Sequence, residues 1–177
     1  MFMATCHLGV IMKAVVLGGA GVIGSYVVQC LSRADTFSSI RIADVNDHRA
    51  QQISNAADNI DWQHLDVTDK QSLLDSLQDA DVVVNCVGPF YKFAPKIIKT
   101  AIDAGIDYVD VCDDYDTTET VIDDLHQHAE NADVTCIVGL GASPGLTNVI
   151  AAYAANELDS VTDVSVYVTR GIGEQAG

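Results

Sequence analysis

Residues 13–24 read KAVVLGGAGVIG, and this segment gives the clearest indication of the fold. Its first five residues form an apolar strand that runs directly into glycines, and residues 22–31 then repeat their apolar side chains at helical spacing. Gly19, Gly21 and Gly24 satisfy the GxGxxG pattern, in which the glycines permit a tight turn, close approach of a pyrophosphate and close helix–strand packing. The stretch therefore predicts a dinucleotide-binding turn.

The same loop fits a second spacing. Gly18, Gly21 and Gly24 also satisfy the GxxGxxG pattern of short-chain dehydrogenases and epimerases. Those enzymes use a Tyr-x-x-x-Lys pair for proton transfer, and no tyrosine in this chain is followed by lysine four residues later. An atypical short-chain reductase or epimerase-like enzyme is therefore the second hypothesis.

Strand and helix patterns alternate along the rest of the chain. Further strands are predicted at residues 40–43, 62–65, 81–85, 108–111, 134–138 and 161–169. Helices are predicted at residues 48–57, 68–77 (capped by Thr68), 95–104 (with Pro95 in the first turn and Gly105 as the stop), 119–131 and 144–158. Such alternation is typical of a Rossmann-type α/β fold, a doubly wound parallel sheet in three layers. We expect an extension at 1–11, a dinucleotide-binding domain at 12–160, and a strand and tail at 161–177.

Two acidic residues follow predicted strands. Asp44 lies 20 residues after Gly24, where an acid accepts hydrogen bonds from the adenosine ribose. A carboxylate there repels the extra phosphate of NADP, so Asp44 favours NAD, although Arg49 nearby can shift the preference; capping of the next helix is the alternative role. Asp66 and Val67 are predicted to contact the adenine, with a plain turn as the alternative. The predicted cofactor contacts in this half are Gly19, Ala20, Gly21, Val22, Ile23, Asp44, Asp66 and Val67.

The chain is strongly acidic. It has 177 residues, with 9 Lys and Arg against 25 Asp and Glu, for a net charge of −16. Such a surface repels nucleic acids and anionic membranes, so we expect a small-molecule substrate. Scattered cysteines without a disulfide pattern and an N-terminus without a secretory pattern predict a cytoplasmic location. An apolar cleft face left by a missing domain would promote association, so a homo-oligomer is a further expectation. Acids are absent from residues 1–34, 82–102 and 134–156. These segments hold strands and the loops beyond them, where open α/β sheets bind ligands; the avoidance of acids by buried strands is the other explanation.

No metal site is predicted. The five cysteines form no CxxC pair, and His126 and His128 lie at i, i+2, which do not face each other on a helix. The acidic run that contains Asp113 lacks the glycine and closing glutamate of a calcium loop, so we interpret it as a solvated turn. Cys86 and Cys112 follow strands, but neither has an obvious histidine partner for a nucleophilic role.

The segments after the fourth and sixth predicted strands carry a more specific pattern. Residues 85–90 read NCVGPF, 101–105 read AIDAG, 108–110 read YVD, and 139–148 read GLGASPGLTN. Together with the glycine loop, they resemble the N-terminal NAD(P)-binding domain of the saccharopine dehydrogenase (saccharopine reductase) family, which includes carboxynorspermidine dehydrogenase-like members. The resemblance runs from about Met12 to Arg170.

This resemblance implies a reaction and some site residues. It implies reversible hydride transfer between a nicotinamide and the carbon–nitrogen bond of an amino-acid or polyamine conjugate. Cys86, Val87, Gly88 and Pro89 are expected beside the nicotinamide ribose. Phe90 and Asp113 are the substrate-side candidates, and the helix after Pro144-Gly145 is expected to begin at the same cleft. No catalytic acid or base is assigned.

Members of that family are longer than this chain and carry a second α+β domain over the substrate. We therefore expect the chain to represent the cofactor domain, which binds a dinucleotide without turnover. A non-catalytic dinucleotide-sensing domain is the remaining alternative.

Overall fold

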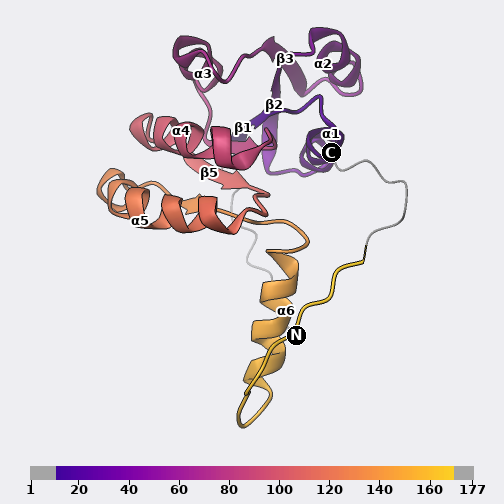
Figure 1. The fold of residues 1–177 in the computed structure, drawn as a ribbon. Coiled ribbons are helices and arrows are strands. Elements are labelled where there is room, and N and C mark those ends of the chain that lie inside the picture. The colour runs from indigo at the N-terminus through magenta and orange to yellow at the C-terminus, as the bar shows by residue number, and fades with distance from the viewer. Residues whose placement is uncertain (1–10, 170–177) are drawn as a thin grey trace. The chain divides into compact units, whose positions relative to one another are not determined.

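The computed structural model describes residues 11–169. Its strands are β1 (Met12–Leu17), β2 (Phe37–Asp44), β3 (Ile60–His64), β4 (Val82–Asn85), β5 (Asp107–Asp110) and β6 (Cys136–Ile137). Its helices are α1 (Val22–Ser32), α2 (Asp47–Ser54), α3 (Lys70–Ser76), α4 (Phe90–Asp103), α5 (Tyr115–Ala132) and α6 (Leu146–Asn156). The strands form a six-stranded parallel sheet in the order β3-β2-β1-β4-β5-β6. A helix follows each strand along the chain, and helices flank the sheet (Figure 1). The predicted Rossmann-type fold is confirmed.

The chain divides into two compact units, one ending at Val84 and the other starting at Asn85. In the first unit, β1 pairs in parallel with β2, and β2 with β3. Helix α1 packs on β1 and β2, and α2 packs on β2 and β3. The core between them consists of fully buried aliphatic side chains, among them Leu17, Val28, Ile40 and Ile42. Apolar burial on this scale gives the glycine loop after β1 a rigid base.

The second unit is built around α4. This helix packs against α5 and β5 and buries Ala94, Ile97, Ile98, Ala101 and Ile102. It ends as predicted at Gly105: the Gly105 N–H bonds the Ile102 carbonyl at 3.0 Å, and the Ile106 N–H bonds the Ala101 carbonyl at 3.0 Å. These two bonds satisfy carbonyls that a helix end leaves without partners.

Three helix starts differ from the predictions. Thr68 does not cap α3; the Asp69 carboxylate does, accepting the N–H groups of residues 71 and 72 at 2.8 and 3.2 Å. Pro95 is not in a first turn but inside α4, because that helix already begins after Pro89, whose backbone is extended. Helix α5 begins at Tyr115 rather than 119, because the Asp114 carboxylate accepts the N–H of residue 117 at 2.8 Å.

The strand predicted at 161–169 is wrong. This segment has no strand pairing in the described part of the chain, and Val164, Val166 and Val168 are exposed. Alternating valines form a strand only when a neighbouring strand takes up their backbone hydrogen bonds. Residues 161–166 instead run back along α6 (Figure 1). Side chains of this segment and of α6 line a groove.

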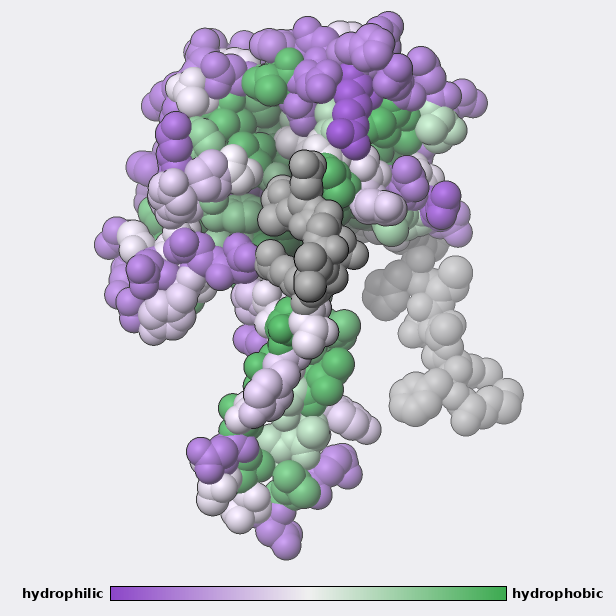
Figure 2. All heavy atoms as spheres, turned by 45° about the vertical axis from the view of Figure 1, so that its right-hand side comes forward, coloured by the Kyte–Doolittle hydropathy of each residue, from purple (hydrophilic) through white to green (hydrophobic). Residues whose placement is uncertain are grey.

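Helix α6 buries none of its residues. Hydrophobic side chains gather over it in Figure 2. Its exposed aliphatic residues are Leu146, Val149 and Ile150, and Tyr153 is exposed beside them, all by more than half. None of the helices within residues 11–169 is both long and apolar enough to cross a membrane.

Candidate functional site

The glycine loop joins β1 to α1 and leaves backbone donors without partners. The Gly18 N–H bonds the Ala43 carbonyl at 2.8 Å, and the Gly21 N–H bonds the Gly18 carbonyl at 2.9 Å. The first amide bonded within α1 is that of residue 25, so within residues 11–169 the N–H groups of residues 22–24 have no acceptor. The first turn of α1 contains no acidic side chain. Donors of this kind, at the positive end of a helix dipole, form an anion-binding site.

The structure brings Asp44 to this loop. Its Oδ2 accepts the Ala20 N–H at 2.9 Å, and its Oδ1 accepts the Asn46 N–H at 2.9 Å. The cap of α2 is Asn46, whose side chain accepts the Arg49 N–H at 3.1 Å, so capping is not the role of Asp44. A carboxylate oxygen has more than one acceptor position, and Asp44 therefore retains capacity to accept ribose hydroxyls.

Asp66 and Val67 lie in the turn after β3. The Asp66 Oδ1 accepts the N–H of Thr68 at 2.9 Å and its hydroxyl at 2.7 Å. Val67 is buried. This geometry describes a side-chain-stabilised turn, and the adenine contact of both residues stays a prediction.

The second unit contains a buried polar chain, which we call the relay (Asn85, Tyr108 and Asp110). The Asn85 Nδ2 donates to the Tyr108 hydroxyl at 2.8 Å, and that hydroxyl donates to the Asp110 Oδ2 at 2.8 Å. All three side chains are fully buried. Burial, followed by the negative charge of Asp110, holds the pKa of Tyr108 well above its usual range, so its hydroxyl keeps the proton it donates. In the sequence these residues stand out only as parts of the motifs NCVGPF and YVD; a polar side chain at the end of an apolar strand is the signal that could have predicted their contact.

The relay ends on backbone amides of three loops. The Asn85 Oδ1 accepts the Val87 N–H at 2.9 Å. The Asp110 Oδ1 accepts the N–H of Cys112 at 3.0 Å and that of Gly139 at 2.8 Å. The segments after β4, β5 and β6 are therefore connected to one buried carboxylate.

The remaining predicted residues of this unit differ in exposure. Cys86 and Val87 are partly buried, whereas Gly88 and Pro89 are exposed. Phe90 begins α4 and is partly buried, and Asp113 is exposed directly before the cap of α5. Gly145 precedes the first residue of α6, close to the predicted start at Pro144-Gly145.

The environment of the cysteines argues against a nucleophilic role. Burial, and then the charge of Asp110, raises the pKa of Cys86 to about 11. Burial is also the main cause that raises the pKa of Cys112. A thiol attacks as its thiolate, which a raised pKa makes scarce near neutral pH.

A labelling experiment tests this environment. With iodoacetamide at about pH 8, we expect exposed Cys30 to be alkylated at least about tenfold faster than Cys86, because almost all of Cys86 is then the unreactive thiol. The Cys86 rate should rise as the pH approaches 11. Peptide mass spectrometry measures both rates in one sample, and the unfolded chain is the control in which the difference should disappear. Equal rates in the folded chain would contradict the buried environment of Cys86.

Asp114 in the acidic loop and His128 have structural partners. Hydrogen bonds from Thr117 hold the pKa of Asp114 below its usual range, as expected for a helix cap. His128 Nε2 lies 2.7 Å from the Asp103 Oδ1. Within residues 11–169, no group of three or more His, Cys, Asp or Glu side chains is arranged to hold a metal ion.

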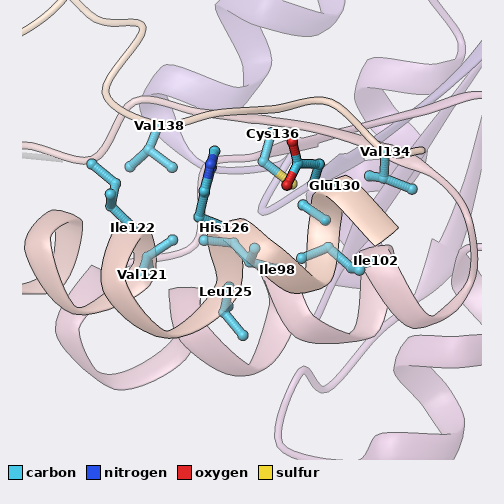
Figure 3. A pocket seen from close by; sticks show the side chains of 11 residues that line it. Ile98, Ile102, Val121, Ile122, Leu125, His126, Glu130, Val134, Cys136 and Val138 are labelled. Carbon is cyan, nitrogen blue, oxygen red and sulfur yellow. The ribbon is translucent and has the colours of Figure 1, made fainter. Parts of the chain in front are cut away.

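An apolar pocket of about 290 Å³ lies between α4, α5 and the chain around β6 (Figure 3). Its lining includes Ile98, Ile102, Val121, Leu125 and Val138. Most of the lining is aliphatic, and the exceptions are His126, Glu130 and Cys136. A pyrophosphate requires a cluster of donors and would be repelled by the Glu130 carboxylate, so we do not assign the cofactor to this pocket.

Comparison with known proteins shows which family has this sequence pattern and fold. The family model described as the saccharopine dehydrogenase NADP binding domain matches residues 14–137. The chain belongs to this family. The match contains the glycine loop, Asp44 and the whole relay.

Two curated relatives and one solved structure illustrate the similarity. A mouse protein named saccharopine dehydrogenase-like oxidoreductase is 24% identical over 62% of this chain and 26% of its own length. A Caenorhabditis elegans protein named lipid droplet localized protein is 28% identical over 55% of this chain and 25% of its own length. Apo saccharopine dehydrogenase (L-Glu forming) from Saccharomyces cerevisiae superposes with a TM-score of 0.71 at 25% identity, covering 82% of this chain and 31% of the yeast chain. The chain thus spans about a quarter of the length of these curated relatives.

Proposed function

We propose that this chain binds the nicotinamide dinucleotide of a saccharopine dehydrogenase-like oxidoreductase. The observation that carries the proposal is the set of unpaired amides at the start of α1, next to the Asp44 carboxylate. The amides fit a pyrophosphate, and the carboxylate fits vicinal ribose hydroxyls. Bound there, the cofactor supplies hydride transfer.

Each predicted residue has a role in this proposal. The loop residues Gly19, Ala20, Gly21, Val22 and Ile23 surround the pyrophosphate in this proposal. The unpaired N–H groups of Val22 and Ile23 donate to it, and an absent side chain at Gly21 keeps the approach open. Asp66 and Val67 border the adenine. By family resemblance, Cys86, Val87, Gly88 and Pro89 contact the nicotinamide ribose, and Phe90 and Asp113 face the substrate.

The proposed substrate class is an amino-acid or polyamine conjugate with a secondary amine, in which the reacting bond joins carbon and nitrogen. The family description and the name of the mouse relative support the saccharopine-like part of this class. The polyamine part, conjugates of the carboxynorspermidine type, rests on the resemblance of the sequence motifs. A net charge of −16 favours such small molecules over nucleic acids or anionic membranes as partners.

The proposed cofactor preference is NAD over NADP, although the family description names NADP. The reason is local: a 2′-phosphate would meet the negative carboxylate of Asp44 where a 2′-hydroxyl would donate to it.

Titration with NADH and, separately, with NADPH tests both statements through nicotinamide fluorescence. Tighter NADH binding supports the proposal. Tighter NADPH binding retains the dinucleotide site and overturns the role of Asp44. A folded chain that binds neither dinucleotide overturns the proposed function of this chain.

Replacing Asp44 by serine should change the preference. We expect Asp44→Ser to weaken NADH binding about tenfold, because charge-assisted hydrogen bonds to the ribose are lost, and to leave NADPH binding equal or tighter. Asp47→Ser is the matched control: it removes the same charge three residues away, from a carboxylate that contacts His64 at 2.7 Å instead of the loop. Equal loss of NADH affinity in both variants would contradict a direct contact from Asp44.

A further inference from the structure

The relay side chains accept backbone N–H groups at equivalent positions of three loops. Val87, Cys112 and Gly139 each lie two residues beyond the end of β4, β5 and β6, respectively. The N–H group of each one donates to a relay side chain, at 2.9, 3.0 and 2.8 Å. The relay therefore sets the direction in which the chain leaves three strands.

The hydrogen bonds of the relay run in one direction. The Val87 N–H requires the oxygen of the Asn85 amide, which turns the Asn85 NH₂ towards Tyr108. The Tyr108 hydroxyl accepts from that NH₂ and can give its own proton only to Asp110. Among the ion pairs found in residues 11–169, none involves Asp110. Neutral donors alone hold this buried carboxylate, an arrangement that is sensitive to the loss of any one of them.

We propose that Asp110 is a positioning residue for cofactor binding. Through the relay it holds the segment 86–89, to which the proposed function assigns the nicotinamide ribose, together with the turns at Cys112 and Gly139. The inference rests on the proposed function and adds to it a residue that lies outside the glycine loop and touches no cofactor itself.

Reversing the relay provides the test. Asp110→Asn presents an NH₂ to Tyr108, so the hydroxyl receives two donors and its own proton has no acceptor. Asn85→Asp presents two carboxylates to one hydroxyl proton. In the double variant Asn85→Asp/Asp110→Asn, the aspartate accepts from the Val87 N–H and the Tyr108 hydroxyl, and the new asparagine donates to Tyr108 while its oxygen accepts the two loop amides. Every group then has a partner again, with the direction reversed.

Asp107→Asn is the matched control. Asp107 lies at the opposite end of β5, is partly exposed, and accepts the Thr135 N–H at 2.8 Å. An asparagine oxygen can accept that single bond, so this variant makes the same chemical change without affecting the relay.

Two ligands separate local from general effects: NADH, and ADP, which lacks the nicotinamide half. We expect each single relay variant to bind NADH about tenfold more weakly and ADP within about twofold of wild type, because a buried unpartnered polar group disturbs only its own loops. The double variant should recover most of the NADH affinity, and Asp107→Asn should match wild type.

The outcomes are distinct. Wild-type NADH affinity in both single variants, or a double variant as weak as the singles, overturns the inference while the proposed function stands. If the single variants lose NADH and ADP affinity equally, the inference that the relay acts on the nicotinamide half is wrong. A folded wild-type chain that binds neither ligand overturns the proposed function and the inference with it. If a single variant does not fold, a folded double variant that binds NADH supports the inference. A double variant that also fails to fold contradicts it, because every relay group was expected to have a partner again.

Discussion

Replacing Gly24 by alanine is expected to abolish NADH binding and to lower the free energy of unfolding by about 3 kcal/mol. A Cβ at Gly24 would overlap the Gly18 carbonyl oxygen and lie 2.7 Å from the Gly19 Cα. Both are backbone atoms of the loop, so no side chain can rotate away. Helix α1 would have to move off the loop, and its unpaired amides would no longer face the position proposed for the pyrophosphate.

Urea unfolding and NADH titration measure the two effects of Gly24→Ala. Gly88→Ala is the stability control, because a Cβ there meets no atom within 4 Å, and its unfolding free energy should stay within about 0.5 kcal/mol of wild type. A Gly24→Ala protein with normal stability and normal NADH affinity would contradict the close packing of the loop on α1.

Gly145→Ala is expected to destabilise the protein by about 3–4 kcal/mol, for two reasons that add. Gly145 has φ +112° and ψ −100°, a conformation that alanine avoids. A Cβ there would overlap the Gly141 oxygen and lie 2.6 Å from the Gly141 nitrogen and 2.8 Å from the Gly139 oxygen. The turn that closes over residues 141–145 before α6 would have to open.

Gly141→Ala, in the same turn, gives a graded comparison. Its Cβ would lie 3.3 Å from the Pro144 oxygen, a tight contact that a shift of a few tenths of an ångström relieves, so we expect a loss of about 1 kcal/mol. Thermal unfolding of the two variants under the same conditions measures the difference. Equal melting temperatures would show that the strain at Gly145 is relieved elsewhere in the chain.

Local patterns were sufficient to predict the strand, glycine turn and helix that carry the first part of the candidate site. The step from an apolar strand to glycines and then to helical spacing lies within residues 13–31, so it is visible without knowledge of any distant contact. Asp44 was predicted from its spacing to Gly24, and the structure brings it to the loop through the N–H of Ala20. The alternation of strands and helices predicted the sheet for the same local reason.

Element ends and the last strand were harder to predict because they depend on competition or on a partner. Thr68 and Asp69 are adjacent and both can cap a helix, and only the folded turn, in which Thr68 bonds Asp66, decides between them. The valines at 164, 166 and 168 have the period of a strand, but the described chain offers their backbone no neighbouring strand. Periodicity describes which side a residue faces, not what it meets there.

The relay could not be predicted from spacing at all. Asn85 and Tyr108 are 23 residues apart, and Asp110 and Gly139 are 29 residues apart. A local signal nevertheless exists: Asn85 ends the apolar run VVV, and Asp110 ends β5. Polar residues at the ends of buried strands are therefore worth examining as hydrogen-bond hubs, even where no pattern relates them to one another.

The absence of any buried side chain in α6 has a consequence for local opening of the second unit. A helix of 11 residues is shorter than the roughly 12–15 residues at which isolated helices become even marginally stable in water, so its persistence depends on tertiary contacts. Helix α4, by contrast, buries a continuous face. The backbone amides of α6 should accordingly exchange with solvent deuterium through low-energy excursions, while those of α4 exchange only in the rarer openings that disrupt the core. The second unit thus combines a cooperative centre around α4 with a helix, α6, that opens more readily.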